Sequence, residues 1–423
     1  MTEKKRLLWF SDTPEHVHVG QSKVARECVQ RLQAYYDVAY AGFAGDSKYV
    51  VREETDGNIV YRGSETKHEG IPVYRILRLC NDVKESLARM TMWYDVIDRF
   101  KPDIIVLSHD VFEFPRLQDM KAKYPHIKIV GYFTVDGDPI DSRWTPAFDS
   151  VDHIWTCSTY GERAIKDRLF WLDVETIPYG INHDTYTSVD TDEISKHKSG
   201  LALNTRDKFV GLYIGHNQGR KNLAAALDGW RIFQKGKSDV MFIVITHHLA
   251  QQVGLWGTMQ QEYDLHSFWC PTTHVFEGVY DDNTVSAYLK AADTLVFPTV
   301  GEGWGMCLSE AMASGCVPIT TNFSGHTDFC TDENSYLMKN GAHVWSNTWM
   351  SRRFIVDPQE VANTIELAYG DWKSGALKEK KLAGIETVAQ YNWDTTAAMM
   401  VESLENRVLK VTKRDRMTKA YMV

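Results

Sequence analysis

The stretch TLVFPTVGEGWGMCLSEAMASGCVPITTN, residues 294–322, reads as a strand, a glycine-rich loop, a helix and a second strand. TLVFPT and VPITTN are short apolar runs of the kind that form buried parallel strands. The segment between them has the composition of a helix. Strands that alternate with helices along the chain are typical of α/β folds, so this stretch predicts an α/β architecture with a parallel sheet.

The same alternation occurs in both halves of the chain. The apolar runs that we interpret as strands are RLLWFSD (6–12), KPDIIVLSHD (101–110), HIKIVGYFTVDGDP (126–139), HIWTCS (153–158), ETIPYGIN (175–182), FVGLYIG (209–215), VMFIVIT (240–246) and THVFEGV (273–279). A polar stretch at 187–200 interrupts the pattern, and 423 residues suit two domains better than one core. We therefore predict two facing Rossmann-like domains, 1–186 and 187–395, with a ligand-binding cleft beyond the carboxyl ends of their strands.

Composition excludes several classes of protein. Hydrophobic residues make up 43% and charged residues 24%, as in ordinary globular proteins. The net charge of −9 argues against a general nucleic-acid-binding protein. Seven cysteines without a C-x-x-C pair indicate neither a zinc knuckle nor a disulfide framework. Apolar runs are too short for a signal peptide or a membrane span, so we expect a cytoplasmic protein, with the basic stretch 410–419 leaving peripheral membrane contact open.

Two glutamates, Glu302 and Glu310, bracket the loop and the start of the helix in GEGWGMCLSE (301–310). The amides of Gly305, Met306 and Cys307 would point outward from a helix N-terminus, which forms an anion site suited to a diphosphate. Ionised carboxylates only accept hydrogen bonds, and sugar hydroxyls donate them. The pattern therefore predicts a sugar nucleotide held by its hydroxyls and its phosphates, whereas the alternative is two solvated glutamates.

The cations that would bind such a diphosphate follow the strand of FVGLYIGHNQGRKN (209–222). Arg220 and Lys221 open the next helix, where positive charge opposes the helix dipole. A solvated basic turn is the simpler interpretation, but two cations at a strand end would also stabilise a leaving diphosphate.

These motifs together resemble the E-x7-E signature of retaining GT-B-fold glycosyltransferases of family 4, the glycosyl transferases of group 1. IPYGINHDTY, GRKN, VFEGVYDDNTVSAYLKAADTLVFPT and YNW (391–393) agree with that family in order, most densely over 175–330. The resemblance implies transfer of a hexose or pentose from a nucleotide-diphosphate sugar, such as a UDP- or GDP-sugar, to an acceptor hydroxyl with retention of configuration. It implies no cofactor, no metal ion, and a C-terminal helix (396–423) that packs back on the first domain.

The resemblance also implies roles for individual residues. Glu310 would bind the ribose, Glu302 the donor sugar, and Lys221 with Arg220 the diphosphate. The remaining donor-binding residues that we predict are Gly20, His216, Gly278, Val279, Gly303, Gly305, Met306, Cys307 and Leu308.

The sequence departs from the family at two positions. His216 stands where many members have an arginine, and Asp136 and Asp138 flank Gly137 where many have a histidine. Asp136 is therefore a catalytic candidate, while Asp138 joins His109 and His16 as candidates on the acceptor side. The DGD triplet has the spacing of a metal-binding D-x-D motif, so a divalent ion there is an alternative.

Transfer with retention in such folds proceeds by front-face attack, which needs a positioned acceptor hydroxyl and a stabilised leaving group. We expect a glycan or lipid-linked acceptor. A hydroxymethylated DNA base is an alternative that would have to be flipped into the site. Two further interpretations are a non-catalytic sugar-nucleotide-binding protein and a non-hydrolysing epimerase.

Overall fold

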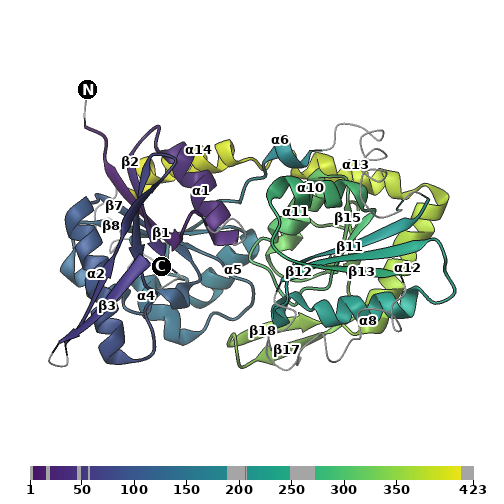
Figure 1. Ribbon diagram of the computed structural model, residues 1–423, viewed down its shortest axis with the longest axis horizontal. Coiled ribbons are helices and arrows are strands. Elements are labelled where there is room, and N and C mark those ends of the chain that lie inside the picture. Colours follow the sequence, from purple (N-terminus) through teal and green to yellow (C-terminus); the bar gives the residue numbers. More distant parts are fainter. Residues whose placement is uncertain are drawn as a thin grey trace. The chain divides into compact units, whose positions relative to one another are not determined.

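The computed structural model describes residues 3–15, 20–44, 49–55, 58–187, 205, 207–247 and 272–410 (Figure 1). The chain forms two compact units. Unit 1 comprises Met1–Val135, Pro139–Tyr179 and Trp393–Val423, and unit 2 comprises Asp136–Asp138 and Gly180–Asn392. The chain thus enters unit 2 for three residues about a third of the way along its length, at the DGD triplet.

Unit 1 is built on an eight-stranded sheet of order β10-β9-β8-β7-β1-β2-β6-β5, in which only β5 is antiparallel to its neighbour. Its strands are β1 Arg6–Asp12, β2 Asp37–Phe43, β5 Glu65–His68, β6 Ile71–Ile76, β7 Ile104–His109, β8 Lys128–Phe133, β9 His153–Thr156 and β10 Val174–Thr176. A separate hairpin joins β3 Val50–Thr55 to β4 Asn58–Gly63. The strands predicted at 6–12, 101–110, 126–139 and 153–158 are present. Of the strand predicted at 175–182, only Glu175 and Thr176 are strand residues, in β10, and β2 to β6 had not been predicted.

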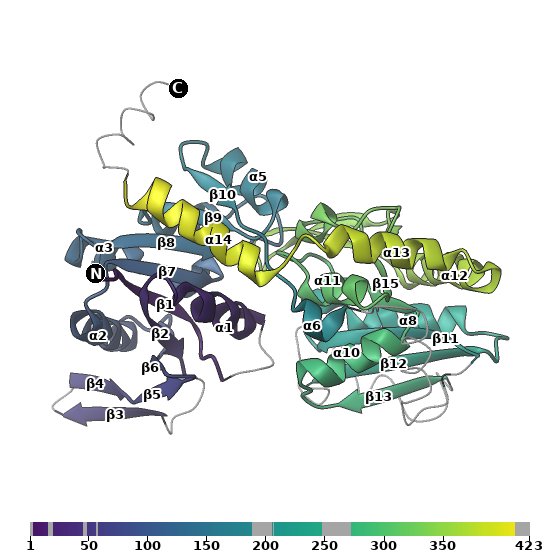
Figure 2. The same ribbon diagram turned by 90° about the horizontal axis from the view of Figure 1, so that it is seen from above.

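The helices of unit 1 are α1 Gly20–Leu32, α2 Val83–Phe100, α3 Leu117–Lys123, α4 Thr145–Asp149, α5 Thr159–Arg168 and α14 Trp393–Ser403. The last of these comes from the far end of the chain and packs beside α1 (Figure 2). Polar contacts fix it there: Trp155 Nε1 donates to Ser403 Oγ at 2.9 Å, and Arg31 pairs with Asp394 at 2.5 Å. Most of the basic stretch 410–419 lies outside the described residues.

Unit 2 contains a six-stranded parallel sheet of order β13-β12-β11-β14-β15-β16. Its strands are β11 Phe209–His216, β12 Val240–His247, β13 Thr273–Glu277, β14 Thr294–Phe297, β15 Val317–Thr321 and β16 Tyr336–Met338. The helices are α6 His183–Tyr186, α8 Leu223–Phe233, α10 Asp282–Ala291, α11 Met306–Ala313, α12 Pro358–Ser374 and α13 Leu377–Val388. An antiparallel hairpin of β17 Ala342–Ser346 and β18 Ser351–Ile355, which the sequence pattern had not indicated, completes the unit.

Each sheet has a point where the strand order reverses. In unit 1 the chain leaves β1 for β2 on one side and later returns to β7 on the other. In unit 2 the same reversal lies between β11 and β14. Ligands of open α/β sheets bind beyond the carboxyl ends of the strands at these points. Candidate ligand-binding side chains are therefore those that follow β1, β7, β11 and β14.

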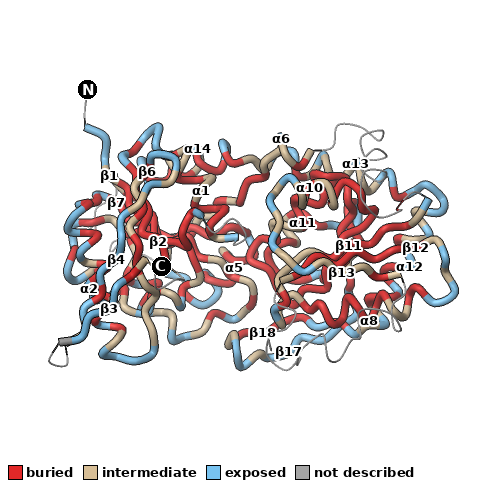
Figure 3. Tube along the Cα trace, in the orientation of Figure 1, coloured by how far each residue is buried: buried red, intermediate tan, exposed pale blue. Residues whose placement is uncertain are grey.

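Both sheets lie within buried cores (Figure 3). In unit 2 the indole of Trp230 is fully buried and stacks on Phe242, with ring centroids 4.7 Å apart and planes within 12°. A Cβ on Gly211 of β11 would come within 2.4 Å of this indole, which shows how closely α8 packs on the sheet. Trp230 Nε1 also donates to Thr272 Oγ1 at 3.0 Å.

Replacing Trp230 by alanine should therefore lower the free energy of unfolding of unit 2 by about 3–5 kcal/mol, because a large cavity would remain against the sheet. Urea denaturation followed by circular dichroism measures this change. Trp171→Ala is the matched control, since Trp171 is 47% exposed in unit 1, and it should cost less than about 1 kcal/mol. Equal losses in the two variants would contradict the packing described for α8.

Candidate active site

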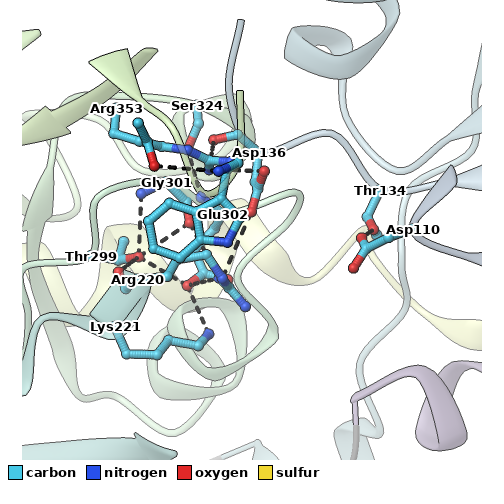
Figure 4. A network of polar contacts seen from close by, with 12 residues as sticks. Asp110, Thr134, Asp136, Arg220, Lys221, Thr299, Gly301, Glu302, Ser324 and Arg353 are labelled. Carbon is cyan, nitrogen blue, oxygen red and sulfur yellow. Dashed lines mark hydrogen bonds and ion pairs between the residues drawn. The ribbon is translucent and has the colours of Figure 1, made fainter. Parts of the chain in front are cut away.

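The carboxylate of Glu302 is the centre of a charged cluster at the switch point of unit 2 (Figure 4). Its Oε1 accepts hydrogen bonds from Arg220 Nη1 at 2.7 Å, Lys221 Nζ at 2.7 Å and Thr299 Oγ1 at 3.0 Å. The two cations follow β11, and Thr299 and Glu302 follow β14. The two strands that flank the switch point thus supply the opposite charges.

Glu302 is only 5% exposed, so its ionisation depends on these partners. Burial by itself would raise the pKa of the carboxyl, but the charges and hydrogen bonds of Arg220 and Lys221 outweigh burial and lower the pKa to about 2. The group is therefore a carboxylate at neutral pH, and its two cations are already held in a largely water-excluded site.

Backbone contacts fix the loop that carries Glu302. Its amide donates to Ser324 Oγ at 2.8 Å, and the amide of Val300 donates to the carbonyl of Arg220 at 3.0 Å. Gly301 has no room for a side chain, because a Cβ there would lie 2.2 Å from the carbonyl oxygen of Asp136. The glycine at this position is thus required by the close approach of the DGD triplet.

Helix α11 begins directly after this loop. Its N-cap, Gly305, has φ 89°, a left-handed conformation that favours glycine. The cap leaves the first-turn amides, including those of Met306 and Cys307, without intrahelical acceptors. This end of α11 has the backbone geometry predicted for an anion site, and its role in binding a diphosphate stays a prediction.

Asp136 is joined to the cluster by two arginines. Its Oδ1 lies 2.8 Å from Arg353 Nη1, and its Oδ2 lies 3.7 Å from Arg220 Nε. Asp138 pairs instead with Arg352 at 3.2 Å. The structure therefore brings Asp136, Arg220, Lys221 and Glu302 together in one network, and their catalytic role stays a prediction.

Sequence reasoning missed Arg353, Thr299 and Ser324. Arg353 lies on β18, in a stretch where no element was predicted, and the adjacent Arg352–Arg353 pair was the one available signal. Ser324 and Thr299 are small polar residues that no motif distinguishes from ordinary loop residues. Only the folded loops show their contact with Glu302.

The other predicted donor-side residues occupy varied positions in unit 2. Glu310 is a buried residue of α11, at 8% exposure, and Gly303 is buried in the loop. Leu308 is fully buried and packs into the core, so its side chain is not available to a ligand. Burial raises the pKa of the Cys307 thiol to about 12, which keeps it neutral.

The remaining candidates lie at the ends of neighbouring strands. His216 ends β11, with its ring 5.6 Å from that of His247 at the end of β12. The amide of Gly278 donates to the carbonyl of Thr246 at 3.0 Å, and Val279 is 40% exposed. Gly20 is the first residue of α1 and belongs to unit 1.

Unit 1 has a second charged cluster at its own switch point. Asp12 and His109 end β1 and β7, and His109 Nε2 lies 3.4 Å from Asp12 Oδ2. Arg78 forms ion pairs with both Asp12 and Glu113 and approaches His109 Nε2 at 3.1 Å. Burial would raise the pKa of the Asp12 carboxyl, but His109 and Arg78 together lower it.

The ring of His109 has polar partners at both nitrogens. Nδ1 accepts a hydrogen bond from the amide of Asp110 at 2.8 Å, and Nε2 lies 3.4 Å from Asp12 Oδ2 and 3.1 Å from Arg78 Nη2. Both ring nitrogens are therefore engaged within unit 1, an arrangement that suits positioning better than proton abstraction. The other acceptor-side histidine, His16, lies outside the described residues.

Neither a metal centre nor a membrane span occurs among the described residues. Within them, no three or more side chains of His, Cys, Asp or Glu come together as ligands for a metal ion. Their helices include none with the length and apolar character needed to span a bilayer.

Comparison with known proteins identifies the fold. Residues 208–366 match the family model described as Glycosyl transferases group 1. No protein of the curated set matches the chain. The chain is similar in structure to sucrose-phosphate synthase from Thermosynechococcus elongatus, with a TM-score of 0.73, 15% identity, and coverage of 95% of this chain and 98% of that one.

Two more solved structures share the architecture. HepE from Anabaena, in complex with UDP and glucose, gives a TM-score of 0.67 at 14% identity and covers 95% of this chain and 99% of its own. The α,α-trehalose 6-phosphate synthase from Burkholderia multivorans gives a TM-score of 0.69 at 10% sequence identity, and the match covers 95% of this chain and 96% of that one. The predicted fold class is confirmed: the chain has the GT-B fold, and the match within unit 2 supports a glycosyltransferase.

The buried pairing of Glu302 should make stability depend on pH. Its folded-state pKa of about 2 lies below the ordinary value of 4.5, so the pairing contributes stability above pH 4.5 that is lost as pH falls towards 2. At 1.36 kcal/mol per pKa unit this amounts to about 3 kcal/mol. Urea unfolding of wild type and Glu302→Gln at pH 7, 4.5 and 3 should show a difference that shrinks with acidity.

The exposed Glu402→Gln variant is the control and should follow the wild type at every pH. A difference between Glu302→Gln and wild type that stays constant down to pH 3 would contradict the assigned ionisation.

Proposed function

We propose that the protein is a retaining glycosyltransferase of family 4 that transfers a sugar from a nucleotide-diphosphate donor to an acceptor hydroxyl without a metal ion. The observation that carries the proposal is the buried Glu302 carboxylate held by Arg220 and Lys221 at the switch point of unit 2. The family match over 208–366 supports it. A cytoplasmic location is part of the proposal and rests on the sequence pattern alone.

In this mechanism the two cations change partners when donor binds. Arg220 and Lys221 exchange some of their hydrogen bonds to Glu302 for hydrogen bonds to the diphosphate. The negative charge of the diphosphate increases as the glycosidic bond breaks. The cations and first-turn amides of α11 are already oriented, so little reorganisation accompanies the reaction. Glu302 then accepts a hydrogen bond from a hydroxyl of the donor sugar, and Glu310 accepts hydrogen bonds from the ribose hydroxyls.

Front-face transfer places the acceptor hydroxyl on the side of the sugar from which the diphosphate leaves. The departing phosphate oxygen can take the hydroxyl proton, so the enzyme needs no nucleophile of its own. Asp136 lies next to Arg220 in the same network and is the group we assign to orienting hydroxyls near the reacting carbon. Proximity and electrostatic stabilisation then supply the rate enhancement.

The donor is tested, without acceptor, by release of the leaving nucleotide, which is a nucleoside diphosphate from UDP-, GDP-, ADP- and dTDP-sugars and CMP from CMP-sugars. The HepE structures contain UDP or UDP-glucose, so we expect UDP-sugars to be hydrolysed slowly. Lys221→Met should lower this rate about 100-fold, since it removes a charge from the leaving group. Glu310→Ala should weaken donor binding about tenfold, the scale of one charged hydrogen bond. The control is Glu333→Ala, an exposed residue of the same unit, which should change neither the hydrolysis rate nor donor binding.

A donor that raises the melting temperature without being hydrolysed would indicate that turnover waits for acceptor. Absence of both hydrolysis and stabilisation across the whole panel would refute the proposed function.

The cluster of unit 1 favours an acceptor without phosphate groups. Asp12, Asp110 and Glu113 place three carboxylates at the carboxyl edge of the sheet, and Arg78, the cation among them, already pairs with two. Carboxylates repel phosphates and accept hydrogen bonds from hydroxyls. We therefore propose a neutral polyol or glycan acceptor, and the same charges weigh against the hydroxymethylated DNA alternative.

Acceptor choice is tested with neutral disaccharides, sugar phosphates and hydroxymethylated DNA in the presence of the active donor. Neutral acceptors should have the highest kcat/KM, by about tenfold or more, because no phosphate is brought against the carboxylates. Glu113→Gln should raise relative use of sugar phosphates, whereas the exposed Glu402→Gln should not. Preference for phosphorylated acceptors or DNA by the wild type would overturn this assignment.

A further inference from the structure

The hairpin β17–β18 brings a buried arginine to the cluster around Glu302. The amide of Phe354 donates to the carbonyl of Val300 at 3.2 Å, which anchors β18 on the loop that carries Glu302. Arg353 is 3% exposed, while the side chain of Arg352, one residue earlier, is 55% exposed. Adjacent arginines on one strand therefore have different environments, and the inward one lies at the proposed active site.

The guanidinium of Arg353 binds Asp136 at two points. Nη1 donates to the main-chain carbonyl of Asp136 at 2.8 Å and lies 2.8 Å from its carboxylate Oδ1. On its other side the guanidinium packs over the ring of Trp349, at 5.0 Å from the centroid. A buried charge needs such a partner, so Arg353 and Asp136 hold each other in place.

Charges of alternating sign continue from this pair to Lys221 (Figure 4). The order is Arg353, Asp136, Arg220, Glu302 and Lys221, with three cations and two carboxylates. Arg220 stands between the carboxylates and lies 2.7 Å from Glu302 but 3.7 Å from Asp136. The unequal distances fit an Asp136 whose stronger partner is Arg353.

We infer that Arg353 is a positioning residue. Its ion pair with Asp136 prevents that carboxylate from pairing closely with Arg220, so that the Arg220 guanidinium can bind the donor diphosphate. The inference rests on the proposed function, because it concerns the same diphosphate site. Without Arg353, the partly exposed Asp136 carboxylate would pair closely with Arg220. Donor would then have to compete with Asp136 for that guanidinium.

A double-mutant cycle tests the inference by isothermal titration of UDP, GDP and inorganic pyrophosphate. Arg353→Met should weaken binding of the preferred nucleoside diphosphate about tenfold, the scale of one charged hydrogen bond. Adding Asp136→Asn should restore the wild-type Kd to within about threefold, because the competing charge is gone. Arg353→Lys, which keeps the charge, should give an intermediate Kd.

The matched control is Arg352→Met on the same strand, which should bind like the wild type, and circular dichroism melts show which variants are folded. A merely structural role for Arg353 predicts no rescue by Asp136→Asn, so failure of rescue in folded variants would overturn the inference. So would equal weakening by Arg352→Met. Failure of the wild type to bind any of the three probes would instead refute the proposed function, and this inference with it.

Discussion

The burial of one carboxylate, Glu302, beneath two cations is the interaction on which the rest of the site depends. Burial by itself raises the pKa of a carboxyl that is only 5% exposed, and Arg220 and Lys221 more than reverse that shift. The same contact also fixes the cations. Both are long side chains that would lose rotamer freedom on binding a ligand, and here they are ordered before any ligand arrives. The site therefore combines two cations that are already in place with a carboxylate that can accept hydrogen bonds from hydroxyl groups.

This interaction explains the unusual backbone around it. Gly301 allows the carbonyl of Asp136 to approach the loop, and Gly305 turns the chain into α11 through a left-handed conformation. Both glycines serve one purpose, which is to present Glu302 and the start of a helix at the same edge of the sheet. The DGD triplet takes part as well, since the chain returns to unit 2 for those three residues and contacts Arg352 and Arg353 there.

Each of the two units has a charged cluster at the switch point of its sheet, but the balance of charge differs between the two clusters. In each sheet, side chains at or after the ends of the strands that flank the reversal pair across the switch point. Asp12 pairs with His109 in unit 1, and Arg220 pairs with Glu302 in unit 2. The unit 1 cluster has more carboxylates than cations, whereas the unit 2 cluster has more cations than carboxylates. That difference suits a hydroxyl-rich ligand at one edge and a diphosphate at the other.

The sequence by itself determined the α/β class and the principal strands, because buried parallel strands must be short apolar runs and their order along the chain is visible. It also located Glu302, Arg220 and Lys221, since glycines and charges that follow such runs come to the carboxyl edge of the sheet. Only the tertiary structure brought Arg353 and Ser324 to the loop that carries Glu302, and only it decided which carboxylate pairs with which cation. The physical reason is that these contacts join segments that lie far apart in the chain. Local periodicity does not indicate which charged residues of a hairpin will be buried and which will face solvent.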